Sequence, residues 1–201
     1  MSLPRRSLLL ALPLAIAAHA QPAGPTAPIA ALNAALQAAM RAGRASPFAT
    51  RAAQFRPAAE RAFDLPAILA ASVGSRFAAF ADPAKRDLLE AFTAFTVATW
   101  VSNFDTDNAE TFEITPQTRA AGTDEIVTTR IVPRTGDPTR LDYVMRQSAA
   151  GWRAIDILLN GTISRVAVQR SDFRTLLAAG DPAPLLASLR DRAARLAGAS
   201  S

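Results

Sequence analysis

Two consecutive segments in the C-terminal half of the chain alternate apolar and charged residues, and this alternation constrains the fold most. In residues 139–147, Leu141, Tyr143 and Met145 occupy alternate positions, and three of the four residues that flank them, at 140, 142 and 146, are charged; residues 152–159 show a similar pattern. A period of two places alternate side chains on opposite faces of a strand, and the short link at residues 149–151 favours antiparallel pairing. The segments therefore predict a hairpin with one apolar face that other elements cover.

The remaining pattern predicts helices before and after a sheet, which is the α+β class. Strands are expected over residues 110–115 and 125–132 as well, giving a four-stranded antiparallel curved sheet. It would pack with several helices around an apolar cavity, in a cone-like shape resembling nuclear transport factor 2-like proteins. Helices are predicted over residues 29–42, 47–63, 65–73, 82–102, 163–178 and 181–196.

Proline and aspartate mark the expected helix boundaries. Asp64 is expected to cap the third helix, with Pro66 in its first turn, and Asp82 to cap the fourth, with Pro83 at its first position. Pro57 is expected to kink or divide the second helix.

The composition indicates one globular domain. The chain has 201 residues, of which 50% are hydrophobic, so it can bury a substantial core. Two of the 22 basic residues precede residue 21, so 20 basic residues face 17 acidic ones in the rest, a net charge of +3 there. An excess this small does not favour nucleic acid as a partner.

The N-terminus has the features of an export signal. Arg5 and Arg6 precede a short apolar stretch, and Ala18–His19–Ala20 has the small-x-small form of a cleavage site. We therefore expect a cleaved signal peptide over residues 1–20, a linker over 21–28 and a single domain over 29–198. The paired arginines allow the twin-arginine route besides ordinary Sec export. The expected location is the periplasm.

The residue types exclude most catalytic chemistry. His19 is the only histidine and leaves with the signal, and the chain has no cysteine. The mature chain thus lacks Ser-His-Asp and Cys-His catalysis, a histidine base and the common zinc ligands. Glycine-rich phosphate loops are also absent. We predict no catalytic residues, no metal and no cofactor.

Carboxylates leave one enzymatic alternative. Asp142 or Asp156, on neighbouring predicted strands, could act as a base if burial raised its pKa. Pairing with Arg140, Arg146 or Arg153 across the sheet is the favoured interpretation. Three acidic residues between the long helix and the sheet could suggest a calcium loop, but they lack the glycine and distal glutamate of an EF-hand, which favours a solvated loop. These three are Asp105, Asp107 and Glu110.

Large apolar residues on the long helix and the sheet are either core or the lining of a lipid pocket. Their amphipathic spacing alone favours the core. The candidates are Ile68, Val73, Phe77, Phe92, Phe95, Trp100, Phe104, Tyr143, Met145, Ile155 and Ile157.

A series of ordered motifs resembles the MlaC/toluene-tolerance family of periplasmic phospholipid-binding proteins, from about residue 29 to residue 190. The stretches 99–105 and 165–173 look nearest to its hopanoid-associated HpnM branch. The motifs are Phe63–Asp64–Leu65, Ala91–Phe92, Arg140–Leu141–Asp142–Tyr143, Gly151–Trp152–Arg153, Asp156–Ile157, Gly161–Thr162–Ile163–Ser164, and Asp172–Phe173 with Leu176–Leu177.

The resemblance implies a non-enzymatic shuttle. Acyl chains would lie in the cavity, with the headgroup at its mouth. The implied partners are phospholipid or another membrane lipid such as a hopanoid, an inner-membrane ABC transporter complex and an outer-membrane lipoprotein complex. Contact with these complexes would be transient and the protein a monomer. The alternatives are a small isomerase or hydrolase using a buried aspartate, and a cargo-free envelope interaction module. Arginines of the last two helices could dock acidic partners or headgroups, although solvated helix faces are the favoured interpretation for each of them (Arg165, Arg170, Arg174, Arg190, Arg192 and Arg195).

Overall fold

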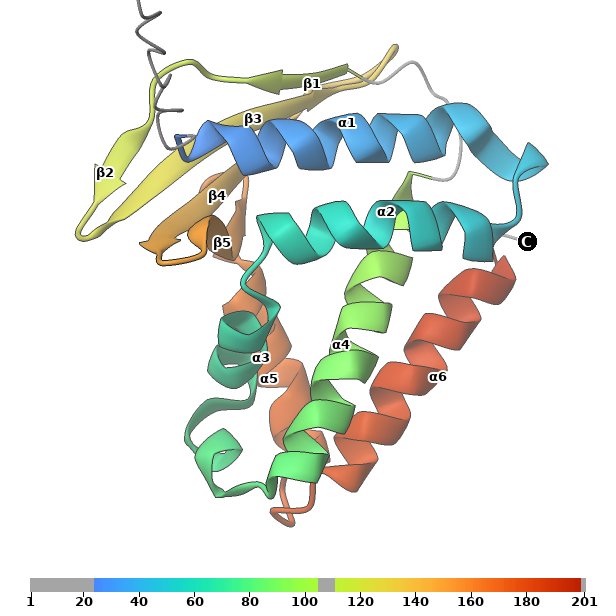
Figure 1. Ribbon diagram of the computed structural model, residues 1–201, viewed down its shortest axis with the longest axis vertical. Helices are drawn as coiled ribbons and strands as arrows, with labels where there is room; N and C mark the ends of the chain where they lie inside the picture. Colours follow the sequence, from blue (N-terminus) through green and yellow to red (C-terminus); the bar gives the residue numbers. More distant parts are fainter. Residues whose placement is uncertain (1–23, 105–110, 200–201) are drawn as a thin grey trace, which may run out of the picture.

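The computed structural model describes residues 24–104 and 111–199 (Figure 1). The predicted signal peptide over residues 1–20 lies outside the described residues, and so do Asp105, Asp107 and Glu110. The described part is an α+β fold with six α-helices and one antiparallel sheet, as the sequence predicts.

The sheet has six strands instead of the predicted four. Four of them match the predicted segments: β1 (Thr111–Ile114), β3 (Asp124–Val132), β4 (Thr139–Ser148) and β5 (Gly151–Leu159). The additional strands are β2 (Arg119–Ala121) and β6 (Ile163–Ser164). The order is β1-β3-β4-β5-β6, and β2 also pairs with β3. Segments of two or three residues are too short to display a period of two, which is why the sequence pattern did not identify them.

A register shift lies at the centre of the β4–β5 hairpin. Val144 is opposite Asp156, whereas Met145 is opposite Ala154, so Ile155 is an extra residue in β5, a β-bulge. On either side of it, Tyr143 is opposite Ile157, and Met145 opposite Ala154, on the covered face of the sheet. Asp142, one residue from Tyr143, is on the other face.

The helices cover one face of the sheet, and α4 and α6 extend away from it (Figure 1). In Figure 1, α1 and α2 lie side by side near the sheet, while α4 and α6 pack together below them. Helix α3 packs against α5. Short 3₁₀ turns at Gly43–Ala45 and Gly74–Ala79 connect α1 to α2 and α3 to α4. The helices are α1 (Thr26–Ala42), α2 (Phe48–Ala62), α3 (Leu65–Val73), α4 (Asp82–Asn103), α5 (Arg165–Leu176) and α6 (Ala183–Ala199).

Local sequence explains several helix boundaries. The Asp64 carboxylate accepts a hydrogen bond from the Ala67 amide at 3.1 Å, which confirms it as the cap of α3. The predicted cap at Asp82 is wrong. Ala81 precedes α4, and Asp82 forms an ion pair with Lys85 at 3.5 Å instead. Pro57 lies within α2 and does not divide it.

No helix in residues 24–104 or 111–199 has the length and apolar character needed to cross a membrane.

Candidate functional site

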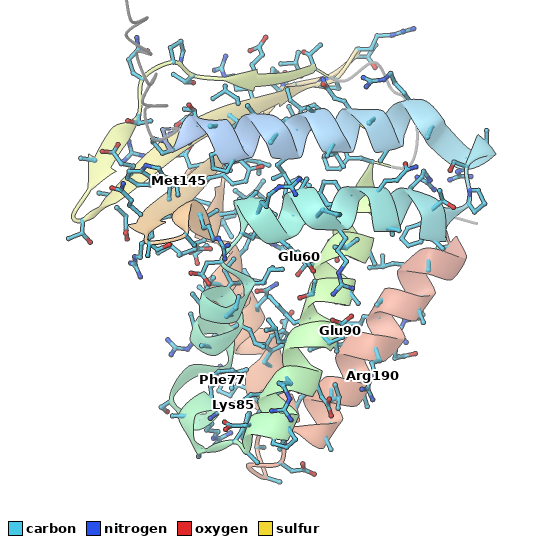
Figure 2. All side chains as sticks on the ribbon, viewed as in Figure 1. Glu60, Phe77, Lys85, Glu90, Met145 and Arg190 are labelled. Atoms are coloured by element: carbon cyan, nitrogen blue, oxygen red, sulfur yellow. The ribbon has the colours of Figure 1, made fainter. Side chains whose placement is uncertain are left out.

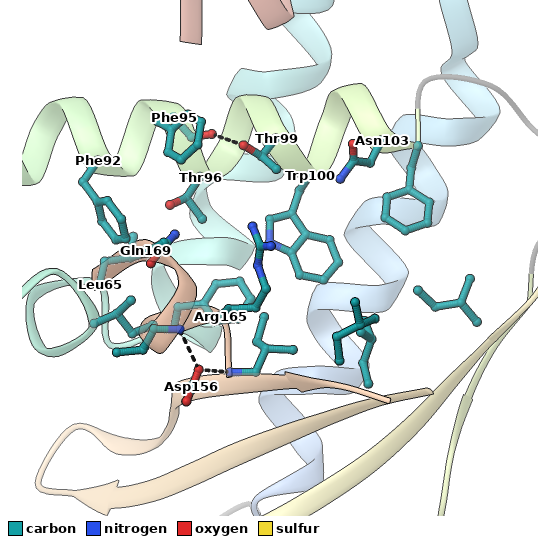
Figure 3. A pocket seen from close by; sticks show the side chains of 18 residues that line it. Leu65, Phe92, Phe95, Thr96, Thr99, Trp100, Asn103, Asp156, Arg165 and Gln169 are labelled. Atoms are coloured by element: carbon teal, nitrogen blue, oxygen red, sulfur yellow. Dashed lines mark hydrogen bonds between the residues drawn. The ribbon is translucent and has the colours of Figure 1, made fainter. Parts of the chain in front are cut away.

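A pocket of about 290 Å³ lies between α4, the covered face of the sheet and the α3–α5 pair (Figure 3). Its volume is near the lower end of roughly 300–1,000 Å³ for ligand sites. Most of the lining is apolar: Phe63, Leu65, Ile68, Phe92, Phe95, Trp100, Phe104, Ile131, Leu141, Ile157, Leu159 and Val166. The polar lining residues are Thr96, Thr99, Asn103, Asp156, Arg165 and Gln169.

One face of α4 forms a wall of the pocket. Phe92, Thr96, Trp100 and Asn103 are four or three residues apart and therefore share that face. The Thr99 hydroxyl donates to the Phe95 carbonyl at 2.8 Å, so its hydrogen-bonding need is met within the helix. Because threonines stand between large rings, this face has a recess where a leucine or phenylalanine would fill the space.

Contacts between aromatic rings connect the α4 wall to neighbouring elements. Trp100 lies 5.9 Å from Phe63 at the end of α2 and 6.0 Å from Phe104, between ring centroids. Phe104 in turn contacts Phe112 of β1 at 5.6 Å, and Phe63 stacks on Tyr143 of β4 at 6.3 Å. This apolar series holds the upper part of the pocket in shape, because aromatic pairs at such spacings attract one another.

The structure brings six of the eleven predicted residues together in the pocket, namely Ile68, Phe92, Phe95, Trp100, Phe104 and Ile157. Tyr143 and Met145 are instead fully buried in the core. Burial raises the pKa of the Tyr143 hydroxyl, which keeps it neutral, while its hydrogen bond with Thr129 acts in the opposite direction.

The other three predicted residues lie elsewhere. Ile155 is the bulge residue of β5. Phe77 packs against Phe80, with 6.3 Å between ring centroids. Val73 lines a separate groove of about 540 Å³, together with Arg76, Arg170 and Arg174.

Sequence reasoning missed several lining residues. Leu141 and Leu159 are opposite each other and share a face with Tyr143 and Ile157, so extending the period of two would have found them. Phe63 and Leu65 flank Asp64, the cap of α3. Sequence periodicity does not indicate in which direction side chains at a helix boundary point.

Asp142 is a structural carboxylate on the sheet face opposite the pocket. Its side chain is fully buried and accepts hydrogen bonds from Arg140 at 2.8 and 2.7 Å and from Arg119 at 3.3 Å. Burial opposes its ionisation, but the hydrogen bonds from Arg140 and Thr128 and the two guanidinium charges outweigh it and lower the pKa of Asp142. The predicted pairing with Arg140 is confirmed, and this residue is not a base with a raised pKa.

Replacing Asp142 by asparagine should destabilise the protein in a pH-dependent way. At pH 7 we expect the free energy of unfolding to fall by about 2–4 kcal/mol, because buried, charge-assisted hydrogen bonds are lost. A carboxyl group whose pKa is lower in the folded state contributes its full stabilisation at a pH above the unfolded-state pKa of about 3.9. That contribution is lost as the pH falls through the folded-state pKa. Urea denaturation of both proteins from pH 7 downward should show the difference shrinking. Asp137→Asn, at an exposed position, is the control. Equal stability at pH 7 would contradict the assignment.

Asp156 lines the pocket, but its carboxylate holds the start of α5. It accepts hydrogen bonds from Ser164 Oγ at 2.5 Å and from the amides of Ile157 and Val166 at 2.7 and 3.1 Å. The predicted pairing of Asp156 with an arginine is therefore wrong within the described part of the chain. Arg146, one of the expected partners, pairs with Asp124 at 2.7 Å.

Residues 24–104 and 111–199 hold no group of three or more histidine, cysteine, aspartate or glutamate side chains that could bind a metal ion. The predicted acidic loop lies outside the described residues.

Two of the predicted docking arginines form surface ion pairs, Arg192 with Asp172 at 4.0 Å and Arg195 with Asp191.

Comparisons with known proteins agree with this architecture. The family model described as MlaC protein matches residues 31–191. A solved structure of a phospholipid-binding protein from Ralstonia solanacearum, in complex with a phospholipid, superposes with a TM-score of 0.74. The two sequences are 20% identical, and the match covers 87% of this chain and 99% of that one, so it shows a shared fold. No curated protein sequence matches. Because the family model covers most of its length, the chain belongs to the MlaC family.

Proposed function

We propose that this protein is a non-enzymatic, periplasmic lipid carrier whose pocket holds the acyl chains of a phospholipid. The observation that carries the proposal is the apolar pocket between α4 and the sheet, walled by Phe92, Trp100 and Ile157. Membership in the MlaC family supports it, and so does the Ralstonia solanacearum protein, which shares the fold and is described as phospholipid-binding.

The energetics of the pocket suit a carrier. Burial of an acyl chain gains about 0.8 kcal/mol per methylene relative to water. A bilayer offers nearly the same gain, so exchange between membrane and pocket is close to neutral, and the direction of transport must come from partners.

The proposed partners are an outer-membrane lipoprotein complex and an inner-membrane ABC transporter complex. The proposed route to the periplasm is the signal peptide over residues 1–20.

The volume of the pocket sets a condition on loading. A lipid with two long chains needs more space than the pocket volume of about 290 Å³. The walls of the pocket must therefore move apart to admit the lipid. Several lining side chains are only half-buried, among them Phe95, Trp100 and Ile157. We propose that the bound lipid contacts these partly exposed side chains.

The rivals to a lipid carrier have less support. An isomerase based on Asp142 is disfavoured because that carboxylate is on the far face of the sheet and bound by two arginines. A cargo-free interaction module does not account for the recess on α4. Within lipid cargo, the resemblance to the HpnM branch makes a hopanoid the alternative to a phospholipid.

Native mass spectrometry of protein purified from the periplasm under mild conditions tests the proposal. We expect a mass excess corresponding to about one lipid per chain, identified as phospholipid after extraction. The same protein, delipidated and offered vesicles, should recover that mass. A chain that is lipid-free from cells and stays lipid-free after exposure to vesicles would contradict the proposed function.

A further inference from the structure

Arg165 provides a positive charge at the pocket. It is the first residue of α5, and its side chain extends from that helix into the pocket toward the α4 wall (Figure 3). The residue as a whole is exposed, so the end of the pocket where it lies meets water. A charged group at the boundary between an apolar recess and solvent is where the polar end of an amphipathic ligand would come to rest.

The charge of Arg165 is not compensated by the protein in residues 24–104 and 111–199. Other arginines there do have carboxylate partners: Arg140 pairs with Asp142 and Arg146 with Asp124. No such pair forms at Arg165, although Asp156 lines the same pocket. Asp156 instead accepts three hydrogen bonds from Ser164, Ile157 and Val166.

Gln169 adds a second donor to the pocket lining from the same helix. It is four residues after Arg165 on α5, so both side chains lie on one face of the helix and both line the pocket (Figure 3). Its carbonyl oxygen accepts from the Ser72 hydroxyl at 3.1 Å, which leaves the amide nitrogen as a donor. The polar end of the pocket therefore presents donors and a positive charge.

We propose that Arg165 and Gln169 form a phosphate subsite at the open end of the pocket, and that this subsite selects phospholipids over neutral lipids. The inference rests on the proposed lipid-carrier function and specifies its cargo. A guanidinium binds phosphate oxygens through two parallel hydrogen bonds, which are stronger than neutral ones. A diacylglycerol or a polycyclic hydrocarbon offers no anion there, so its binding would depend on the apolar walls alone.

Figure 2 shows the described side chains as sticks on the ribbon, and the same helix offers a matched control for Arg165. Arg174 is nine residues after Arg165 on α5, is exposed, and lines the separate groove instead of the pocket. Arg174→Gln therefore removes the same charge from the same helix without touching the proposed subsite.

The test compares two ligands with identical chains, dioctanoyl phosphatidylglycerol and dioctanoylglycerol, by isothermal titration calorimetry. The full mature chain should bind the phospholipid at least about tenfold more tightly, as expected for charge-assisted hydrogen bonds. Arg165→Gln should lower phospholipid affinity to near that of the neutral lipid and leave neutral-lipid binding unchanged. Arg165→Lys should keep part of the preference, and Arg174→Gln all of it.

Three results would overturn the subsite. These are an unchanged preference in Arg165→Gln, no preference in the unsubstituted protein, or an equal loss in Arg174→Gln. Inorganic phosphate should compete only weakly, since it lacks the chains, and tight binding of phosphate alone would assign the site to a free anion. If neither lipid binds the unsubstituted protein, the proposed function itself fails, and the two failures are thus distinguishable.

Discussion

Met145→Asp is expected to prevent stable folding. Met145 is fully buried on the covered face of β4, opposite Ala154 and within the main core. An aspartate there would be an unpaired buried charge or a protonated acid without a partner, and either costs more than about 4 kcal/mol. Typical domains are stable by only about 5–15 kcal/mol, so most of that margin disappears. Circular dichroism during urea titration should show a greatly reduced midpoint or no folded baseline.

The control for this substitution is Gln147→Asp, two residues further along the same strand and exposed. It changes the same face of β4 outside the core, so its unfolding midpoint should stay close to that of the unsubstituted protein. If Met145→Asp folded normally and lost only lipid, Met145 would line an open chamber, and the division between core and pocket described above would be wrong.

Thr96→Trp should weaken lipid binding by roughly a hundredfold or more while the protein stays folded. Thr96 stands between the rings of Phe92 and Trp100 on the pocket face of α4, so an indole there would grow into the recess. Exclusion of about four methylenes at about 0.8 kcal/mol each reduces affinity by roughly a hundredfold or more. Titration with dioctanoyl phosphatidylglycerol, alongside thermal unfolding, measures both properties.

Arg86→Trp on the exposed part of α4 is the matched control, since it adds the same ring to the same helix away from the pocket. It should bind lipid as the unsubstituted protein does. Normal lipid binding by Thr96→Trp with an unchanged fold would place the lipid somewhere else on the molecule.

The sequence predicted the elements whose periodicity extends over many residues. Alternation in β4 and β5 defined the hairpin, and the Asp64 cap with Pro66 fixed the bounds of α3 at Leu65–Val73. It failed where an element is too short to have a period, as in β2 and β6. It also failed at Asp82, because an aspartate before a proline can occupy either the cap or the first turn, and tertiary packing decides which.

The pocket lining was harder to predict than the fold. The apolar face of α4 follows from spacing, but periodicity does not distinguish a side chain facing a recess from one facing another side chain. Tyr143 shares a sheet face with Ile157, yet Phe63 stacks on Tyr143 and fills the space there. Phe63 comes from a distant part of the chain. Only the fold therefore reveals which side chains line the pocket and which are covered by other side chains.

The partners of the charged residues could also be predicted only in part from the sequence. Asp142 found its predicted partner Arg140 two residues away in the sequence, and a second one, Arg119, from the unpredicted strand β2. Asp156 was expected to pair with an arginine but instead holds the first turn of α5 through Ser164 and Val166. Short-range pairs are visible in a sequence, whereas contacts between strand and helix depend on how the elements meet.

Photocrosslinking tests most directly whether acyl chains enter the pocket. A phospholipid with a diazirine at the end of one acyl chain would be loaded into the protein, irradiated, and the labelled residues located by peptide mass spectrometry. Labels are expected on the pocket face of α4 and on β5, around Phe92, Trp100 and Ile157, and to disappear in Thr96→Trp. Labels confined to the outer surface of α6 or to the exposed face of the sheet would contradict a lipid held between α4 and the sheet.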